Sequence, residues 1–418
     1  MVNTNVPFTD TARTKIVVNL PGLPADVNIL DQTSVREITC TESILTPGLQ
    51  TTVAIQDKIH STPYKRNLDL YQYQPLHIQM KRPILKDFGQ NEDFFLVQTV
   101  YRLDNRSPDS YALQKFNLQA CDPSLLADAN SLVSKSWKCT PPHQVVADVL
   151  SQCIGIPASK LQVETSAPNR DYIAENIHPF QVCTQQADVA LASGTDPSFL
   201  HFMTYENLGT HHFKSLKKMA QQAPLFSGQP FVYNEKGVGQ SGYWNPFDIM
   251  QYSFPCDFDG LTDILNGVGE GGVNKRSVQT FNPANGVWSN LGINDNGCGI
   301  GGAAALAATT NFGTAEQQDS CPIAVEKYAL LRQARMMLLE PDKLALRIVI
   351  PFNPNVNAGK TINVVFENKG DEFGEPTDHL NYASGKYLIA SLTHTYNAGG
   401  YAITTLDCVS ESVSRGQV

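Results

Sequence analysis

The stretch Leu76-His-Ile-Gln-Met-Lys81 decides the fold class, because apolar and polar side chains alternate along its whole length. Successive side chains of a β-strand point to opposite faces, so this pattern predicts a strand with one apolar and one polar face. The same period runs through residues 51–59, where Thr51, Val53 and Ile55 would share one face. One polar face is typical of antiparallel or barrel-like sheets, which we expect here.

Further strand patterns extend this sheet and recur at the other end of the chain. Phe94 to Asp104 and Tyr111 to Ala120 are β-patterned, and the turn-rich residues 105–110 between them predict a long hairpin. The pattern returns near the C-terminus in four segments, which are 344–350, 362–366, Lys386 to Tyr396 and Tyr401 to Val409. The last two segments are joined by Asn397-Ala-Gly-Gly, which predicts a second hairpin.

The middle of the chain has a different period. Apolar residues recur about every 3.6 positions in two segments, which predicts helices from Thr140 to Gly155 and from Pro179 to Gly194. Alternation then resumes at 198–205 and 210–216, which predicts another hairpin. The helices are therefore expected to be inserted between sheets.

A long segment after these elements lacks both periodicity and positive charge. No Lys or Arg occurs from Ser277 to Glu326, and the centre, Gly292 to Thr314, is rich in Gly, Ala and Asn. Such a composition predicts a loop or linker. A period of about 3.6 then predicts a helix from Pro322 to Glu340, which Pro341 would end.

Together these patterns predict an α+β, β-rich fold in which two barrel-like antiparallel β-modules bracket an α+β middle domain. The first module is expected at residues 1–118 plus about 196–236, and the middle domain at 119–195 plus about 237–290. A Gly/Ala-rich loop would cover 291–320, and the second module 321–374, with the hairpin region 375–418 completing it.

Composition excludes several classes of protein. The 418 residues carry 31 Lys and Arg against 40 Asp and Glu, a net charge of −9. No basic surface of the kind that neutralises phosphates is therefore expected, which argues against sequence-specific binding of nucleic acid. No run reaches the roughly 18 apolar residues of a membrane span, and the N-terminal residues do not resemble a secretory signal. The nine cysteines are scattered and unpaired in sequence, so we expect free thiols that are mostly buried.

No motif in the sequence carries a specific chemistry. Two G-x-G-x-x-G matches, at 267–272 and 297–302, lack the strand and helix of a dinucleotide-binding unit. Ala358-Gly-Lys-Thr361 looks like the end of a phosphate-binding loop, but Pro354 occupies the place of its first glycine, so a β-turn is expected. Adjacent His211 and His212 would point to opposite faces of a strand and could not bind one ion together. Asp257, Asp259 and Asp263 bring oxygen ligands together as a calcium loop does, but they lack its closing glutamate. Weak metal binding at these three residues is left open. We therefore predict no catalytic residue, no cofactor and no dedicated metal site.

Three groups of residues, taken in order, resemble one known family. They are Asn176-Ile-His-Pro-Phe-Gln181; Phe199-Leu-His-Phe-Met-Thr-Tyr-Glu206 with His212-Phe-Lys-Ser-Leu216; and Gly385-Lys-Tyr-Leu-Ile-Ala-Ser-Leu-Thr-His394 with Gly400-Tyr-Ala-Ile-Thr-Thr-Leu406. The set is similar to the central hub protein of the baseplate of contractile-tailed bacteriophages, a family related to the spike-hub proteins of bacterial contractile injection systems. The segment 292–314 has no counterpart in that pattern.

The resemblance implies a structural virion protein of the tail baseplate, assembled in the host cytoplasm and without enzymatic activity. It implies a homotrimer whose two barrel-like modules per chain alternate around a ring and join a threefold spike to a sixfold tail tube. Its partners would be further copies of itself, the tail spike, the tail tube and the baseplate wedge proteins. The alternatives are a tail-associated cell-wall hydrolase and a carbohydrate-binding adhesin, the latter weakened by the dispersal of Trp137, Trp244 and Trp288.

Two kinds of interaction site follow from these expectations. Strands 48–59 and 386–396 come from different modules and are long enough to pair along an edge, so we expect them near inter-module seams. The residues assigned to this interface are Thr51, Val53, Ile55, Tyr387, Ile389 and Leu392. The loop Gly292 to Thr314, represented by Gly292, Ile300 and Phe312, is expected to dock a partner chain.

Overall fold

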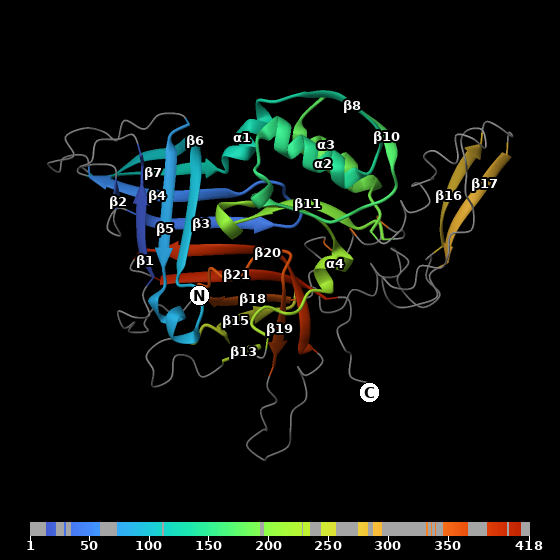
Figure 1. Ribbon diagram of the computed structural model, residues 1–418. Coiled ribbons are helices and arrows are strands. Elements are labelled where there is room, and N and C mark those ends of the chain that lie inside the picture. Colours follow the sequence, from blue (N-terminus) through green and yellow to red (C-terminus); the bar gives the residue numbers. More distant parts are fainter. Residues whose placement is uncertain are drawn as a thin grey trace, which may run out of the picture.

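The computed structural model describes the protein as a β-rich chain with one helical layer (Figure 1). The residues that it describes are 14–21, 29–30, 35–58, 73–110, 113–192, 196–227, 229–234, 244–255, 275–282, 287–294, 346–366, 383–398 and 401–410, with Arg332, Met336 and Leu339. The predicted fold class, β-rich α+β with large antiparallel sheets, is confirmed.

The first β-module is an antiparallel sheet in the order β3–β4–β7–β6–β5–β1–β2. Its strands are β1 (Lys15–Asn19), β2 (Ile29–Leu30), β3 (Val35–Ser43), β4 (Gln50–Lys58), β5 (Pro75–Lys81), β6 (Asp93–Ser110) and β7 (Leu113–Cys121). The short 3₁₀ helix Pro83–Phe88 follows β5. Leu76, Ile78 and Met80 are buried in one core, as the alternation predicts. In Figure 1, β1, β5 and β6 cross the direction of β3, β4 and β7, so the sheet folds over this core.

The hairpin of β6 and β7 has a different turn from the expected one. Residues 105–110 belong to β6 rather than to the connector, and they pair with β7 as far as Ser110. Register shifts between Asp104 and Ser107 and between Pro108 and Ser110 accommodate the turn-type residues, and Asn105 has a φ of 54°. A bulge leaves an extra residue unpaired without ending the strand, so turn-forming residues can remain inside a ladder.

The second β-module is a closed ring of strands. Each strand pairs with the next in the order β13–β19–β20–β21–β18–β15, and β14, separated from β15 by Met250 alone, pairs back with β13. The strands are β13 (Phe231–Tyr233), β14 (Asp248–Ile249), β15 (Gln251–Ser253), β18 (Leu346–Pro351), β19 (Thr361–Val365), β20 (Gly385–Asn397) and β21 (Tyr401–Val409). A second apolar core, which includes Phe231, Ile348 and Ile389, fills this ring. The predicted C-terminal hairpin is confirmed as β20 and β21.

One strand joins the two modules into a continuous sheet. The first residues of β20, Gly385 to Leu388, pair with β19, whereas Ser391 to Asn397 pair with β3 of the first module. The two modules therefore share β20, and Figure 1 shows β3 and β20 running side by side.

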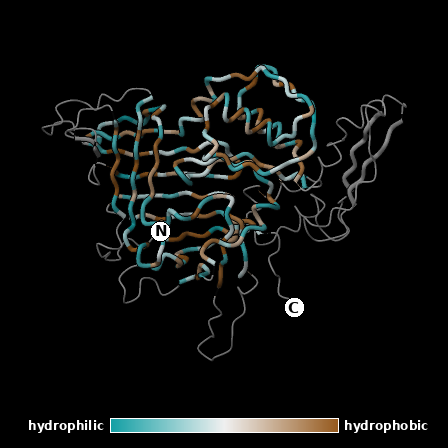
Figure 2. Tube along the Cα trace, in the orientation of Figure 1, coloured by the Kyte–Doolittle hydropathy of each residue, from teal (hydrophilic) through white to brown (hydrophobic). Residues whose placement is uncertain are grey.

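The middle domain forms a layer of helices and short strands over one side of the modules (Figure 1). It contains α1 (Pro123–Ala129), β8 (Val133–Thr140), α2 (Pro142–Val149), β9 (Leu161–Val163), β10 (Arg170–Ile177), α3 (Pro179–Val189), β11 (Phe199–Thr204), β12 (Thr210–Ser215) and α4 (Leu216–Ala220). Three shorter helical turns lie at Leu150–Ile154, Ala158–Lys160 and Glu206–Leu208. The hydropathy-coloured trace in Figure 2 shows apolar residues along α2 and α3 and along the strands beneath them. The sheet β11–β12–β9 packs one face against these helices and the other toward the modules.

Both predicted helices and the predicted hairpin are confirmed, with shifted ends. The first helix continues from α2 into a π-helical turn and stops at Gly155, whose φ of 82° suits glycine. The second, α3, ends at Val189 and not near Gly194. The hairpin consists of β11 and β12.

The segment predicted as a loop begins within a strand. β16 (Lys275–Asn282) and β17 (Val287–Asn294) form a two-stranded hairpin in which Gly292 pairs with Ser277. The prediction of a loop at Gly292 was wrong because glycine content and missing positive charge do not prevent main-chain pairing. Residues 295–314 lie outside the described residues. The structure describes only Arg332, Met336 and Leu339 of the helix predicted from Pro322 to Glu340. Arg332 and Met336 are helical.

Candidate functional site: the junction of three units

The six residues assigned to an inter-module interface lie inside the chain. Thr51, Val53 and Ile55 are on β4, which pairs with β3 and β7, and all three are buried. Tyr387, Ile389 and Leu392 are on β20, the strand that joins the two modules, and they too are buried. β20 therefore lies at the boundary between the two modules of one chain, and β3 separates it from β4. A role of these strands at a seam between chains stays a prediction.

The other sequence candidates divide into described and undescribed residues. Ile300, Phe312, the three aspartates at 257, 259 and 263 and both G-x-G-x-x-G matches lie outside the described residues. Gly359 has a φ of 76° in the turn before β19, so the predicted β-turn at 358–361 is confirmed. His211 stacks on His201 toward the helices, whereas His212 stacks on Phe202 toward the modules, as predicted.

Most cysteines among the described residues are buried, as the sequence analysis predicts. Among the described residues, Cys40, Cys121, Cys183 and Cys408 are buried, while Cys139 and Cys153 are more accessible. No group of three or more His, Cys, Asp or Glu among these residues could hold a metal ion. None of the described helices has the length and apolar character needed to cross a membrane.

The polar residues that do converge lie where the two modules and the middle domain meet. We call this place the three-unit junction and define it by Glu42 on β3, by Tyr205 and Glu206 after β11, and by Ala358 to Lys360 before β19. Glu42 is 1% exposed. Its Oε2 accepts the main-chain N–H of Tyr205 at 2.7 Å, and its Oε1 accepts the main-chain N–H of Ala358. A single carboxylate of the first module therefore bonds to both other units.

Tyr205 anchors the middle domain to the first module. Its hydroxyl lies 3.0 Å from the carbonyl oxygen of Gln50 and 3.2 Å from that of Thr41, to which it donates, and it also contacts the Thr51 hydroxyl. Its ring packs edge-on against Phe94 in the core of the first module. Thr51, which the sequence assigned to an interface, thus contacts a residue of the middle domain within the same chain.

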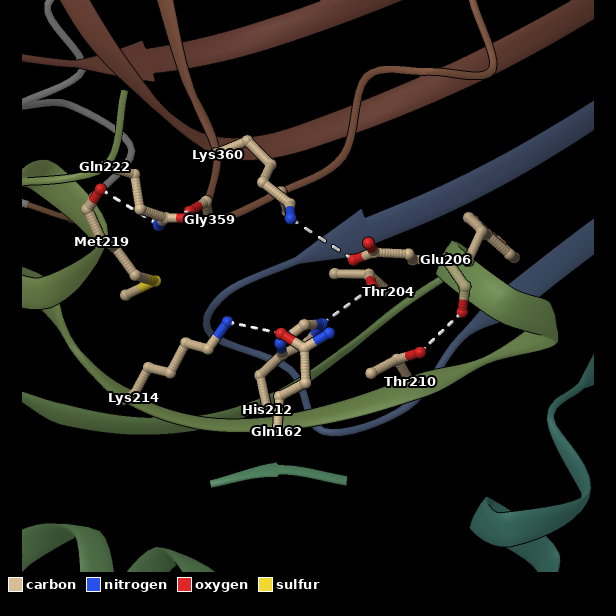
Figure 3. Close-up of polar contacts among 12 residues, drawn as sticks. Gln162, Thr204, Glu206, Thr210, His212, Lys214, Met219, Gln222, Gly359 and Lys360 are labelled. Atoms are coloured by element: carbon tan, nitrogen blue, oxygen red, sulfur yellow. Dashed lines mark hydrogen bonds and ion pairs between the residues drawn. The ribbon is translucent and has the colours of Figure 1, made fainter. Parts of the chain in front are cut away.

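A second set of polar contacts surrounds the junction on the side of β12 (Figure 3). Lys360 Nζ lies 3.5 Å from Glu206 Oε2, which links the second module to the turn after β11. His212 Nε2 lies 2.9 Å from the Thr204 hydroxyl, and Lys214 donates to Gln162 Oε1 at 2.7 Å. These contacts tie β9, β11 and β12 to each other and to the second module.

The turn of the second module approaches the middle domain closely. A Cβ placed on Gly359 would lie 2.8 Å from Phe202 Cζ and 3.0 Å from Met219 Sδ. The Gly359 carbonyl also accepts a bond from the Gln222 amide at 2.9 Å, as Figure 3 shows. Only glycine fits both this φ and this spacing.

Burial controls the charge of the junction. Desolvation raises the pKa of Glu42 to about 8, although the N–H groups of Tyr205 and Ala358 oppose that shift. Desolvation also lowers the pKa of His212 to about 3, helped by the nearby charges of Lys214 and Lys360. At pH 7 the His212 imidazole is neutral and the Glu42 carboxyl is largely neutral, so hydrogen bonds rather than ion pairs hold both groups. The contacts of the junction join three units of the chain to each other.

Sequence reasoning missed Glu42, although a signal was present. Ile38, Cys40 and Ile44 occupy alternate positions of β3 and its end, and all three are buried. Glu42 stands on the same face of that alternation, so it interrupts an apolar series. A charged residue on the apolar face of a predicted strand indicates a buried polar contact. Tyr205 and Ala358 carry no comparable signal for their contacts with Glu42, since both use main-chain N–H groups.

Comparisons with known proteins place this fold. No family model matches the sequence, and no curated protein is significantly similar to it. The 43 kDa tail protein of prophage MuSo2 from Shewanella oneidensis has a similar structure, with a TM-score of 0.55 and 13% identity, covering 96% of this chain and 99% of that chain. The tail protein from Neisseria meningitidis MC58 has a TM-score of 0.51 and 11% identity, covering 96% of this chain and 98% of that chain. The chain therefore has the fold of phage tail proteins, and the likeness expected from the sequence is confirmed for the fold.

Proposed function

We propose that this protein is a structural component of a phage tail and forms the hub of its baseplate. The observation that carries the proposal is the similarity to the prophage tail protein over nearly the full length of both chains. Two β-modules joined by one strand, with separate cores, agree with the architecture that a hub requires. The location would then be the virion tail, after assembly in the host cytoplasm.

The hub would be a homotrimer that joins a threefold spike to a sixfold tail tube. Two modules in each of three chains would give six similar positions around a ring, while the remainder of each chain keeps threefold symmetry. A closed ring also covers strand edges that a β-rich chain would otherwise expose. Its partners would be the spike, the tail tube and the baseplate wedge proteins. The fold groups residues 199–215 with the middle domain, and 231–233 and 248–253 with the second module. The division expected from the sequence, at residues 118, 195, 236, 290 and 320, stays a prediction that limited proteolysis would test.

The segment that follows the β16–β17 hairpin would be the docking element for one of these partners. Its sequence has no apolar periodicity and no Lys or Arg, and loops of such length in a compact protein are often functional. Replacement of residues 295–314 by a short Gly/Ser linker keeps the hairpin, and should leave the trimer and its melting transition unchanged while reducing incorporation into baseplates. Unchanged incorporation would identify the segment as a spacer.

The proposed role needs no enzymatic activity. Purified protein should release no soluble fragments from peptidoglycan. Release that a single Asp or Glu substitution abolishes would instead support the cell-wall hydrolase.

Electron microscopy of the purified protein tests the proposed ring. Class averages should show a threefold ring with six peripheral densities of similar size, one for each β-module. Isolated particles of single-chain size, also in the presence of the spike protein, would contradict the hub.

A further inference from the structure

The most unusual group in the described structure is the carboxylate of Glu42. It is buried between the two modules and the middle domain, and each of its oxygens accepts a main-chain N–H from a different unit. Among the described residues, no Lys, Arg or His forms an ion pair with it. A buried carboxylate normally has a cationic partner, because burying an unpaired charge is costly. Glu42 has only neutral donors.

We propose that Glu42 is a proton-linked latch, which holds the middle domain and the second β-module on the first module when protonated and loosens them when ionised. In the closed junction, β3, the turn after β11 and the turn before β19 meet around this buried carboxyl group. Separation of the units exposes the group to water, where the ionised form is favoured. Opening of the junction is therefore coupled to loss of a proton.

The direction of the pH effect follows from this coupling. Burial raises the pKa of Glu42 from an ordinary value of 4.5 to about 8 in the closed junction. A group with a raised pKa stabilises the closed form fully below the ordinary pKa, and this contribution is lost as the pH rises through the raised one. The junction should thus be firmest near pH 5 and should open more readily as the pH approaches about 8.

The other groups that face the junction do not titrate in the same way. Burial raises the pKa of the Cys40 thiol to about 12 and that of the Tyr205 phenol well above 10, so both stay neutral. His212, with a pKa of about 3, is neutral above pH 5. The negative charge of Glu206, which is paired with Lys360, adds to the raised pKa of Glu42. Burial lowers the pKa of Lys214, which is bonded to Gln162. The Glu42→Gln variant therefore decides whether the change between pH 6 and pH 8.5 belongs to Glu42.

Hydrogen exchange measured by mass spectrometry on the intact protein tests the latch. Protection, corrected for the intrinsic pH dependence of exchange, is compared at pH 6 and pH 8.5 in peptides that contain the amides of Tyr205 and Ala358. The variants are Glu42→Gln, which cannot ionise, and Glu37→Gln, a matched control at an exposed position of the same strand.

We expect protection in both wild-type peptides to fall several-fold from pH 6 to pH 8.5. Glu42→Gln should show equal protection at both pH values, and Glu37→Gln should behave as wild type. Equal protection of the wild-type peptides at the two pH values would overturn the latch, and so would a fall in Glu42→Gln as large as in wild type. The wild-type comparison stands even where Glu42→Gln fails to fold. Hydrogen exchange at Tyr205 and Ala358 reports on contacts within one chain. It therefore tests the latch independently of the trimer, which electron microscopy and molar mass test.

Discussion

Two buried ionisable side chains of the first module, Glu42 and Arg82, bond to main-chain groups of other units. Arg82 stands at the end of β5, is 3% exposed, and donates to the carbonyl oxygens of Phe352 at 2.8 Å and of Trp244 at 3.0 Å. Glu42 accepts two main-chain N–H groups instead. In both places one side chain of the first module satisfies main-chain groups of other units.

The two connections respond differently to pH because the two groups differ in their ordinary pKa. Desolvation lowers the pKa of Arg82 to about 10, so the guanidinium stays charged throughout the neutral range. The pKa of Glu42, raised to about 8, falls within reach of that range. We therefore expect the Arg82 connection to be independent of pH across the neutral range, and the Glu42 connection to weaken as the pH rises toward about 8.

The largest effect is expected in acid. There the loss of folding stability should come from protonation of buried histidines, and not from Glu42 or Arg82. Burial lowers the pKa of His211 to about 4 and those of His212 and His394 to about 3. A lowered pKa gives stability that is present above the ordinary value of 6.5 and lost as the pH falls toward the lowered values. Thermal melts from pH 7 to pH 3.5 should therefore show a steep fall below pH 6.

The substitution His212→Gln sharpens this prediction. It removes one titrating group, so the dependence of the unfolding free energy on pH between 4 and 6 should become shallower by about one proton, or roughly 1.4 kcal/mol per pH unit. An unchanged slope would show that His212 does not contribute to acid unfolding.

The next largest effect is expected at the arginine connection. Arg82→Ala leaves the carbonyl groups of Phe352 and Trp244 without their donor and removes buried packing, so the unfolding free energy should fall by about 2–4 kcal/mol. Arg102→Ala is a matched control, because the Arg102 side chain is 67% exposed. Chemical denaturation should show less than about 0.5 kcal/mol for the control. Equal stability of the two variants would show that the Arg82 bonds do not stabilise the contact between the modules.

A smaller effect is expected where the second module touches the middle domain. Gly359→Ala should lower the unfolding free energy by about 2–3 kcal/mol, because the new methyl group meets Phe202 and the positive φ is unfavourable. Gly89→Ala is the control, since Gly89 has a similar φ of 68° but nothing within 4 Å of a Cβ. It should cost about 1–2 kcal/mol from the backbone alone. Equal costs in denaturation experiments would show that the contact with Phe202 relaxes freely.

The smallest effect is expected from Tyr205→Phe, which keeps the ring against Phe94 and removes only the hydroxyl. Loss of its bonds to the Gln50 and Thr41 carbonyl groups should lower the unfolding free energy by about 1 kcal/mol. Tyr73→Phe, at a residue that is 53% exposed, should change it little. A loss equal to that of Arg82→Ala would mean that Tyr205, rather than Arg82, is the stronger connection.

Local patterns predicted most elements, because the period of the buried side chains is set by the element itself. The alternation at Leu76 to Met80 and the 3.6 period before Gly155 both correspond to elements of the structure. Residues 105–110 and Gly292 were misassigned because bulges and main-chain pairing override turn-type composition. The Arg82 and Glu42 connections join positions hundreds of residues apart through main-chain groups, and no local pattern records such contacts.

The molar mass of the chain in solution decides whether it forms the proposed trimeric hub. Light scattering coupled to size exclusion, on the purified protein at tens of micromolar, should give three times the chain mass of 45.9 kDa. A mass of 45.9 kDa that persists when the spike protein is added would show that the chain is a monomer and not a trimeric hub.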